Sequence, residues 1–339
     1  MASKFTMADI AKLAGVSTST VSRALKGHQS IPDVTRERIV KIAKEHHYVL
    51  NTRARNFRLQ RSQTIATVFP YKGNSKRMIS DPFYMEILGA VADALDPHHY
   101  DLMISRVPLD NQDWCEDYVQ HKRVDGIIIV DCAVEDKNIS RLQELGALFV
   151  VLKPPTPDQT YISVGGYSYE ASLKAVRHLY DLNRRKIGFI GGNQDMVETH
   201  LRYEGYKQGL SDLGLNYDER LVAFTDFSPQ AGADATRALL ERVPDLDAIF
   251  VCSDFMAIAA MQVLVENNRV IPRDVSIVGY DDIHLALHST PPLTTIRQNT
   301  NISGHLLVDK LLDLIDGKPV ESEYVPTELI VRASCGAQS

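Results

Sequence analysis

The stretch MADIAKLAGVSTSTVSRAL, residues 7–25 of a 339-residue chain, predicts two short helices joined by a tight turn. In its first half Ile10, Ala11 and Ala14 recur at the spacing of a helix that buries one face. Thr6 precedes them as a candidate N-cap, with an acidic residue three positions later that stabilises the first turn. The stretch therefore has the layout of a helix-turn-helix.

The second half is a turn followed by a helix with one polar face. Gly15 ends the first helix because glycine adopts the left-handed conformation without steric cost, and Ser17 is placed to cap the second helix. The side chains predicted to face inward are Val16, Val21 and Leu25. Those predicted to face outward are Thr18, Ser19, Thr20, Ser22 and Arg23. Short polar side chains let a helix lie deep in the major groove of DNA, and an ordinary helical hairpin is the alternative.

A third helix is predicted from near Pro32 to about His47. Proline is harmless in a first turn because the amide at that position has no partner within the helix. Ile39, Ile42 and Ala43 would pack against the first two helices. The three helices together predict a small all-helical head.

Residues 6–25, with IPDVTRERIVKIAKEHHYVLN at 31–51, resemble the DNA-binding head of the lactose repressor family of bacterial transcription regulators. The similarity continues through nearly the whole chain. It implies that residues 51–63 form a hinge helix that becomes ordered on the operator. Phe57 stands where the family has a leucine that enters the minor groove, and covering the surface of the body is its alternative role. Leu50 replaces the family's usual proline.

The resemblance and the polarity of the second helix predict binding to double-stranded, palindromic operator DNA. Arg23, Thr18 and Ser19 are predicted to read base edges. The two short side chains cannot make the bidentate contact of a glutamine with adenine, so the operator preference should be the protein's own. The other predicted DNA contacts, mostly to phosphates, are Thr6, Ser17, Thr20, Ser22, Lys26, Thr35, Asn51, Ala54 and Phe57.

The charge of the chain is divided sharply between its two parts. Residues 1–61 carry 12 Lys and Arg against 4 Asp and Glu, a net charge of +8. The rest of the chain carries 25 basic and 39 acidic side chains, a net charge of -14. Because phosphate contacts supply most nonspecific affinity for DNA, a basic head on a separate acidic body fits a DNA-binding regulator.

From Thr64 onward, short apolar runs alternate with amphipathic segments of helical length. Continuous apolar runs of this length indicate buried parallel strands in βαβ units. About a dozen elements of each type are too many for one sheet, so two doubly wound subdomains are expected. The runs are TIATVFP (64–70), YDLMISRV (100–107), VDGIIIVD (124–131), LFVVLK (148–153), KIGFIGG (186–192), AIFVCSD (248–254) and SIVGYDD (276–282).

The predicted fold class is α/β, with a helix-turn-helix head and a body like that of periplasmic binding proteins. The head covers residues 1–50, the hinge helix 51–63 and the body 64–339. The points at which the chain crosses between subdomains come from the resemblance. It implies a first subdomain at about 64–163 and 293–322, and a second at about 164–292 and 323–333.

Several polar and aromatic residues follow the predicted strands, where ligands of such sheets bind. Arginine and carboxylate groups there can hold sugar hydroxyls, and aromatic faces can stack on a ring. The resemblance implies that a small sugar-like effector is contacted by Phe83, Tyr84, Arg202, Phe227, Ser253 and Asp281. The alternatives are core packing for the phenylalanines and a surface ion pair for the arginine.

Three neighbouring features are given other roles. Asp254 is predicted to cap a helix and Asp282 to be a loop charge rather than a ligand. Gly166 and Tyr167 replace the Asp-Asn pair usual in the family, which puts the hinge or dimer contacts of that loop in doubt.

No catalytic residue, metal site or cofactor is predicted. The four cysteines, Cys115, Cys132, Cys252 and Cys335, have no CxxC spacing and are interpreted as reduced thiols. No apolar run is long enough for a membrane span or signal peptide, so a cytoplasmic protein associated with the nucleoid is expected.

The favoured function is a homodimeric regulator, most simply a repressor of carbohydrate-utilisation genes, whose operator affinity is controlled by a sugar-like effector. Leucine heptads of a tetramer-forming tail are missing after the last predicted strand. A sugar-binding transport receptor is the alternative, which the basic head opposes. A sugar-processing enzyme is a third, opposed by the lack of an activated nucleophile or an acid and base pair.

Overall fold

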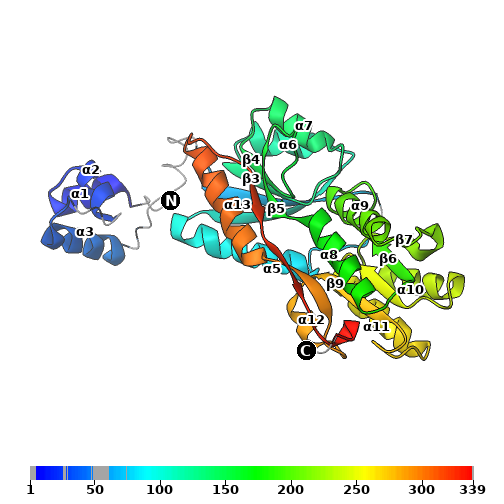
Figure 1. Ribbon diagram of the computed structural model, residues 1–339. Coiled ribbons are helices and arrows are strands. Elements are labelled where there is room, and N and C mark those ends of the chain that lie inside the picture. The colour runs from blue at the N-terminus through cyan, green and yellow to red at the C-terminus, as the bar shows by residue number, and fades with distance from the viewer. Residues whose placement is uncertain are drawn as a thin grey trace. The chain divides into compact units, whose positions relative to one another are not determined.

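The computed structural model describes residues 5–25, 28, 30–46, 48, 61–73 and 75–337. The chain divides into two compact units, residues 1–62 and 63–339 (Figure 1). Within the described ranges, no helix has both the length and the apolar character needed to cross a membrane. Outside these ranges lie residues 51–60 of the expected hinge helix, Leu50, and the predicted DNA contacts Lys26, Asn51, Ala54 and Phe57.

The described residues of the first unit form three helices: α1 (Met7–Ala14), α2 (Thr18–Leu25) and α3 (Asp33–Glu45). Thr6 caps α1 through a reciprocal capping box with Asp9, as the spacing predicted. Gly15 follows with φ 62°, the left-handed conformation that turns the chain between the two helices.

The core of this unit is small and comes from all three helices. Ile10, Val21 and Ile39 are completely buried. Val16 and Leu25 are half-buried against them, so the predicted inward face of α2 is confirmed. Because each helix contributes to one shared core, the polar face of α2 is held at the surface.

The second unit contains two six-stranded sheets. The first has the strand order β11-β5-β4-β3-β1-β2 and the second β12-β10-β9-β8-β6-β7. All neighbouring strands are parallel except β12, which runs antiparallel to β10. The strands are β1 (Thr64–Tyr71), β2 (Asp101–Pro108), β3 (Gly126–Val130), β4 (Phe149–Leu152), β5 (Ile162–Gly166), β6 (Ile187–Gly191), β7 (Val222–Phe224), β8 (Ala248–Val251), β9 (Ser276–Asp281), β10 (Thr294–Gln298), β11 (Glu323–Val325) and β12 (Thr327–Ile330).

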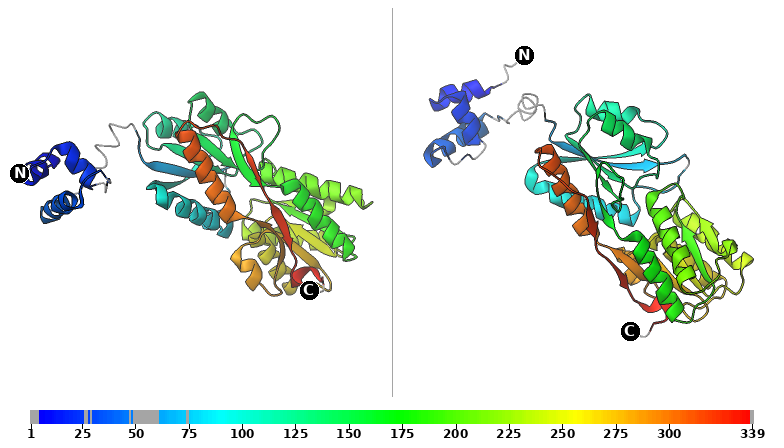
Figure 2. Two further views of the ribbon diagram at one scale, coloured as in Figure 1. Left: turned by 60° about the vertical axis from the view of Figure 1, so that its left-hand side comes forward. Right: turned by 45° about the horizontal axis from the view of Figure 1, so that its top comes forward.

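Helices cover both faces of each sheet. In the first subdomain α5 packs beside α13 on one face, where both views of Figure 2 show them together, and α6 and α7 cover the other. In the second subdomain α8 pairs with α9, and α10 pairs with α11. The helices are α5 (Pro82–Leu95), α6 (Asp113–Val119), α7 (Lys137–Glu144), α8 (Ser168–Asp181), α9 (Val197–Asp212), α10 (Pro229–Arg242), α11 (Asp254–Glu266), α12 (His284–His288) and α13 (Thr300–Ile315), with short 3₁₀ turns at Asp96–His98, Glu219–Leu221 and Ala333–Cys335.

The two-sheet architecture and all seven predicted strands are confirmed, and the crossings lie a few residues later than the approximate points expected. β10 continues beside β9 to Gln298, so the second subdomain extends past the boundary expected at 293. β11 pairs with β5 at 323–325, so the first subdomain ends later than the expected 322. β5 itself reaches Gly166 in the first sheet, beyond the expected 163. The crossing points depend on which strands pair with each other. The periodicity of apolar residues carries no information on this pairing.

The sheet ends are closely packed where the chain leaves the first subdomain. A Cβ added at Gly165 would lie 2.2 Å from the backbone carbonyl carbon of Lys153. Only glycine fits this contact between β5 and the segment after β4.

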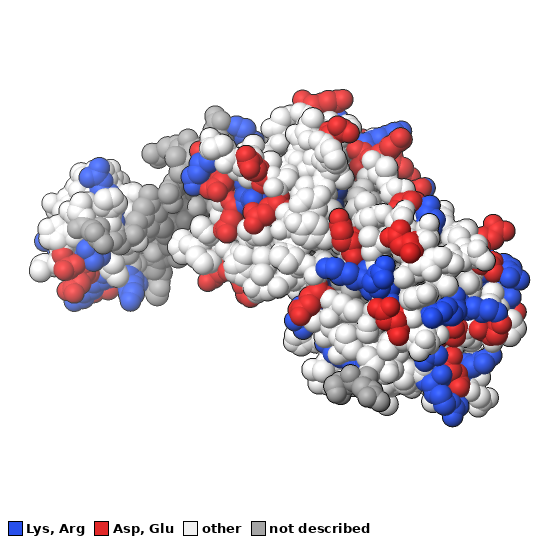
Figure 3. All heavy atoms as spheres, viewed as in Figure 1, with Lys and Arg blue, Asp and Glu red and all other residues white. Residues whose placement is uncertain are grey.

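The surface of the body is mixed in charge. Acidic and basic side chains are interspersed on the face seen in Figure 3.

Candidate functional site

The predicted DNA-reading face of α2 is open to solvent. Thr18, Ser19 and Arg23 are exposed, whereas Thr20 and Ser22 are partly covered. Among the described residues no carboxylate pairs with the Arg23 guanidinium. Its five N–H groups are therefore available to an outside acceptor such as a base edge or a phosphate.

The hydroxyl groups at the start of α2 are arranged by one another. Ser17 Oγ accepts a hydrogen bond from the Thr20 amide at 3.1 Å, as expected of a cap. The same oxygen lies 2.7 Å from Ser19 Oγ and 2.9 Å from Thr20 Oγ1. Thr6 has its hydroxyl engaged in the α1 cap, 2.6 Å from Asp9 Oδ2, and Thr35 is half-buried on α3.

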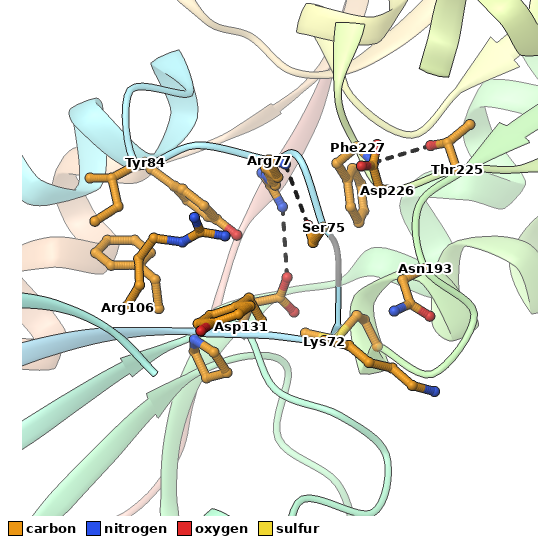
Figure 4. A pocket seen from close by; sticks show the side chains of 15 residues that line it. Lys72, Ser75, Arg77, Tyr84, Arg106, Asp131, Asn193, Thr225, Asp226 and Phe227 are labelled. Atoms are coloured by element: carbon orange, nitrogen blue, oxygen red, sulfur yellow. Dashed lines mark hydrogen bonds and ion pairs between the residues drawn. The ribbon is translucent and has the colours of Figure 1, made fainter. Parts of the chain in front are cut away.

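A second candidate site lies in the body at the carboxyl ends of the strands, the usual ligand position in such sheets. It consists of two adjoining cavities that share Arg77, Asp131 and Phe227. The larger, about 170 Å³, is also lined by Phe69, Pro70, Tyr71, Lys72, Ser75, Ile79, Tyr84, Arg106, Asn193, Met196, Thr225 and Asp226 (Figure 4). The smaller, about 20 Å³, is also lined by Phe83, Val130, Leu152, Glu198, Arg202, Asp281 and Gln298. Both subdomains contribute to each cavity.

Five of the six predicted effector contacts line these cavities. Phe83, Arg202 and Asp281 face the smaller cavity, and Tyr84 faces the larger. Phe227 belongs to both. The sixth, Ser253, precedes α11 and lines neither cavity in the described chain, although its buried hydroxyl has no hydrogen-bond partner there.

Arg202 on α9 is a buried cation, not the surface ion pair of the alternative interpretation. One terminal nitrogen donates to the carbonyl of Cys252 at 2.7 Å, and the other lies 3.2 Å from a carboxylate oxygen of Glu198. Its guanidinium carbon is 3.7 Å from the centre of the Tyr280 ring. The remaining nitrogen, Nε, is buried without a partner among the described residues. It could donate to a ligand hydroxyl.

Asp281 ends β9 with φ 118°, a conformation that side chains rarely adopt. Such strain is typical of functional sites, where the surroundings hold a side chain in place. Gln298 Nε2 donates to its carboxylate at 2.7 Å. Burial raises the pKa of Asp281, although Arg202 and Arg77 oppose that shift. Because Asp281 lines the smaller cavity, its carboxylate could accept a hydrogen bond from a ligand hydroxyl.

The prediction that Asp254 caps a helix is wrong in detail. Ser253 is the N-cap residue of α11, and Asp254 is its first helical residue. The Asp254 carboxylate accepts hydrogen bonds from the Thr295 hydroxyl at 2.6 Å and from the Ile283 amide at 3.0 Å. It therefore links the start of α11 to β10 and to the turn after β9, and burial raises its pKa.

Asp282 is likewise more than a loop charge. Its carboxylate accepts hydrogen bonds from Arg297 at 2.7 Å and from Arg332 at 2.6 Å. Nearby, the unusual Tyr167 stacks on Tyr324, with ring centres 4.5 Å apart. Tyr167 lies in the connection between β5 and α8, and Tyr324 lies in β11, just before the chain crosses to β12. The departure at this loop therefore supplies an aromatic contact where two connections leave the first sheet.

Two charged residues that line both cavities, Asp131 and Arg77, were not predicted from the sequence. Asp131 follows β3 with φ 71°, and burial raises its pKa to about 6. Its position directly after an apolar run was a usable signal. Arg77 lies in the segment between β1 and α5, where no periodicity marks it. Glu198 and Gln298 were also missed because each acts through a neighbour, Arg202 and Asp281.

The described residues hold no cluster of three or more histidine, cysteine, aspartate or glutamate side chains suited to a metal ion. All four cysteines are buried and unpaired by disulfides.

A helix-turn-helix unit joined to a two-sheet body with a cavity at its strand ends defines the class of ligand-responsive DNA-binding regulators. The family of "Bacterial regulatory proteins, lacI family" matches residues 6–51, and "Periplasmic binding protein-like domain" matches residues 176–335. The chain belongs to the LacI family, whose members are transcription regulators and not enzymes.

Similar curated proteins cover almost the whole chain. The HTH-type transcriptional regulator CelR of Thermobifida fusca is 34% identical over 337 residues, which are 97% of this chain and 98% of that protein. The HTH-type transcriptional repressor CytR of Escherichia coli K12 is 32% identical over 98% of this chain and 96% of its own. The ribose operon repressor of Haemophilus influenzae is 31% identical over 91% and 92%.

Solved structures of the same family have the same fold. A CelR complex with cellobiose superimposes with a TM-score of 0.74 at 33% identity, covering 97% of this chain and 99% of that one. The lac repressor dimer bound to operator and the anti-inducer ONPF superimposes with a TM-score of 0.84 at 26% identity, covering 99% and 100%. The predicted family, fold class and function as a DNA-binding regulator are thereby confirmed.

Proposed function

We propose that this regulator is a homodimeric repressor of carbohydrate-utilisation genes, and that a small sugar-like effector controls its affinity for a palindromic operator. The proposal rests on the combination of two features in one chain. The basic first unit exposes a polar helix face, and the second unit has a cavity at which the buried Arg202 Nε lacks a partner among the described residues. Two heads reach two half-sites only at a fixed spacing. An effector that turns one subdomain on the other therefore changes operator affinity.

In this proposal α2 enters the major groove. Arg23 reads a base edge, with Thr18 and Ser19 beside it, because these three side chains are the exposed ones on that helix. The remaining predicted contacts hold phosphates or, for Phe57, the minor groove. Such a regulator acts in the cytoplasm, on the nucleoid.

The cavity chemistry favours a polyhydroxylated ring as the effector. Asp131 and Asp281 offer carboxylate oxygens, and Arg202 Nε offers a donor. Tyr84 and Phe227 add aromatic faces. The similar regulator CelR forms a complex with cellobiose, so this disaccharide is the first sugar to test. A transport receptor would use the same body, but it would have no use for a DNA-reading helix.

A mobility shift tests the proposal as a whole. The full chain is titrated with DNA from the promoters flanking its gene, alone and with cellobiose, other disaccharides, monosaccharides or sugar phosphates. We expect one retarded dimer complex whose affinity changes with one class of sugar. Sugar binding without any DNA binding would support the transport receptor instead.

A further inference from the structure

One arginine fills the space between the two aromatic rings of the larger cavity. The guanidinium carbon of Arg77 lies 4.0 Å from the centre of the Tyr84 ring and 4.4 Å from that of Phe227. Tyr84 belongs to α5 of the first subdomain, and Phe227 follows β7 of the second. Figure 4 shows the guanidinium between the two side chains. Arg77 thus joins aromatic groups of both subdomains.

Two carboxylates hold the guanidinium in this position. Arg77 Nε lies 2.9 Å from Asp81 Oδ2, and a terminal nitrogen lies 3.7 Å from Asp131 Oδ2. The Arg77 side chain is only 10% exposed, and that of Asp81 is 3% exposed. The two carboxylates and the two rings surround the guanidinium, so Arg77 is held in this position in the protein without effector.

An effector ring cannot occupy the same space as a packed guanidinium. We propose that Arg77 sets effector affinity and specificity by filling the stacking position between Tyr84 and Phe227 until the effector displaces it. This inference rests on the proposed function, because it concerns the same effector site.

Displacement also restricts the class of effector. Once Arg77 leaves, Asp81 and Asp131 are buried carboxylates that need new partners. A neutral ring with several hydroxyl groups can donate hydrogen bonds to Asp131, whereas a phosphate or carboxylate placed against Asp81 and Asp131 would be repelled. Arg77 thus selects uncharged polyhydroxylated effectors over sugar phosphates and sugar acids.

Calorimetric titration of the full chain with cellobiose tests the displacement. The Arg77→Ala variant should bind about tenfold more tightly than the wild type, because removing the competing cation–π contacts makes every molecule competent to bind. Arg77→Lys keeps the charge beside Asp81 without the flat face, so its gain should be smaller. Unchanged or weaker binding by a folded Arg77→Ala variant would overturn the inference.

Lys76→Ala is the matched control. Lys76 has the same charge, lies next to Arg77 and is exposed, and its link to Asp226 uses the backbone amide, which the substitution retains. Its affinity for cellobiose should equal that of the wild type. Cellobiose 6-phosphate should bind the wild type at least tenfold more weakly than cellobiose, and equal binding would contradict the selection against charge.

Ethylguanidinium provides a further readout, because a purely structural role of Arg77 would not make this compound compete with cellobiose. It should fill the vacated position in Arg77→Ala, raise the melting temperature of that variant and return its cellobiose affinity toward the wild-type value. It should change neither the melting temperature nor the cellobiose affinity of the wild type and of Lys76→Ala. If cellobiose binds none of these proteins, the choice of sugar fails, and the competition is measured with the sugar found by the mobility shift. Ethylguanidinium that does not lower the affinity of Arg77→Ala for that sugar would overturn the inference.

Discussion

The proposed DNA-reading face and the proposed effector cavities differ in how far apart in the sequence their residues lie. The exposed face of α2 comes from one stretch of eight residues, Thr18–Leu25. The cavities gather side chains from Phe69 to Gln298, at the ends of at least six strands. Residues close together in the sequence, including helix caps and a turn, form the first site. The second site forms only when strands that are far apart in the sequence pair in the sheets.

The two sites also differ in how their polar groups are satisfied. On α2, hydroxyls bond to close neighbours and Arg23 stays in solvent. In the cavities, charged groups are buried and paired with distant partners, and some polar atoms have none within the described chain. We therefore expect substitutions on α2 to change binding alone, and substitutions around the cavities to change both stability and binding.

The largest expected effect concerns the close packing of the body. Gly165→Ala would drive a methyl group into backbone after β4, so the unfolding free energy of the body should fall by about 3 kcal/mol, at the upper end of overpacking costs. Thermal unfolding monitored by circular dichroism checks this. Gly89→Ala, a helix position with nothing within 4 Å of the new methyl, is the control and should not destabilise. Equal melting temperatures for both variants would contradict the close approach.

Arg23→Ala should weaken specific operator binding by about 2 kcal/mol, the cost of losing one bidentate base contact. Fluorescence anisotropy at fixed salt measures it. The melting temperature and sugar affinity should stay unchanged, because the exposed Arg23 supports neither the core nor the cavity. Operator affinity equal to that of the wild type would remove Arg23 from the reading face.

Asp281→Asn should weaken effector binding by about 2 kcal/mol, since it removes a charged acceptor for ligand hydroxyls. Calorimetry with the sugar found by the mobility shift is the measurement. Operator affinity without sugar should be retained, and its parallel loss would indicate misfolding of the body instead.

Two aspartates of the larger cavity should respond oppositely to pH. Burial raises the pKa of Asp131 to about 6, so its ionisation costs stability, and this cost grows as pH rises from about 4 to 6. Asp131→Asn should therefore stabilise by about 1 kcal/mol at pH 7.5, with the gain vanishing towards pH 4. Burial opposes ionisation of Asp226 too, but hydrogen bonds from Ser228 and the Lys76 amide lower its pKa.

The ionised form of Asp226 therefore contributes stability that is present at neutral pH and is lost as pH falls through its lowered pKa. Asp226→Asn should destabilise at pH 7.5, the opposite sign to Asp131→Asn. Urea unfolding at pH 4, 5.5 and 7.5 compares the two variants. The same sign for both at pH 7.5 would show that burial does not govern Asp131.

The smallest effect is expected at the cap of α1. Thr6→Ala should cost about 1 kcal/mol of stability in the first unit, because the capping box loses the Thr6 hydroxyl, which bonds to both the amide and the carboxylate of Asp9. Thr18→Ala, on the exposed face, is the comparison and should leave stability unchanged while it weakens operator binding. Hydrogen exchange of the α1 amides distinguishes the two.

The same contrast explains what could be predicted from sequence. Thr6, Gly15 and Ser17 act within three or four residues of their own positions, so spacing alone identified their roles. The apolar runs predicted the two sheets because each run is likewise a local feature of the sequence. The short β7, β11 and β12 were missed because three or four residues carry no measurable periodicity.

The cavity was predicted only in part. Residues directly after strands, such as Asp281, follow from the rule that strand ends carry ligands. Arg77 could not be found in this way, since its place depends on Tyr84 and Phe227, which are far apart in sequence. The exact crossing points could not be predicted for a similar reason. The pairing of β10 with β9, for example, determines where the chain leaves the second sheet.

The stacked pair Tyr167 and Tyr324 has a mechanical consequence. Three segments connect the subdomains, and this pair fastens the segment after β5 to that at β11, while Tyr324 also donates to the carbonyl of Pro155. Because these two segments are joined, they resist twisting relative to each other. They can still bend together about one common axis. We expect the body to open about a single axis, so that a small push in the cavity becomes a directed rotation.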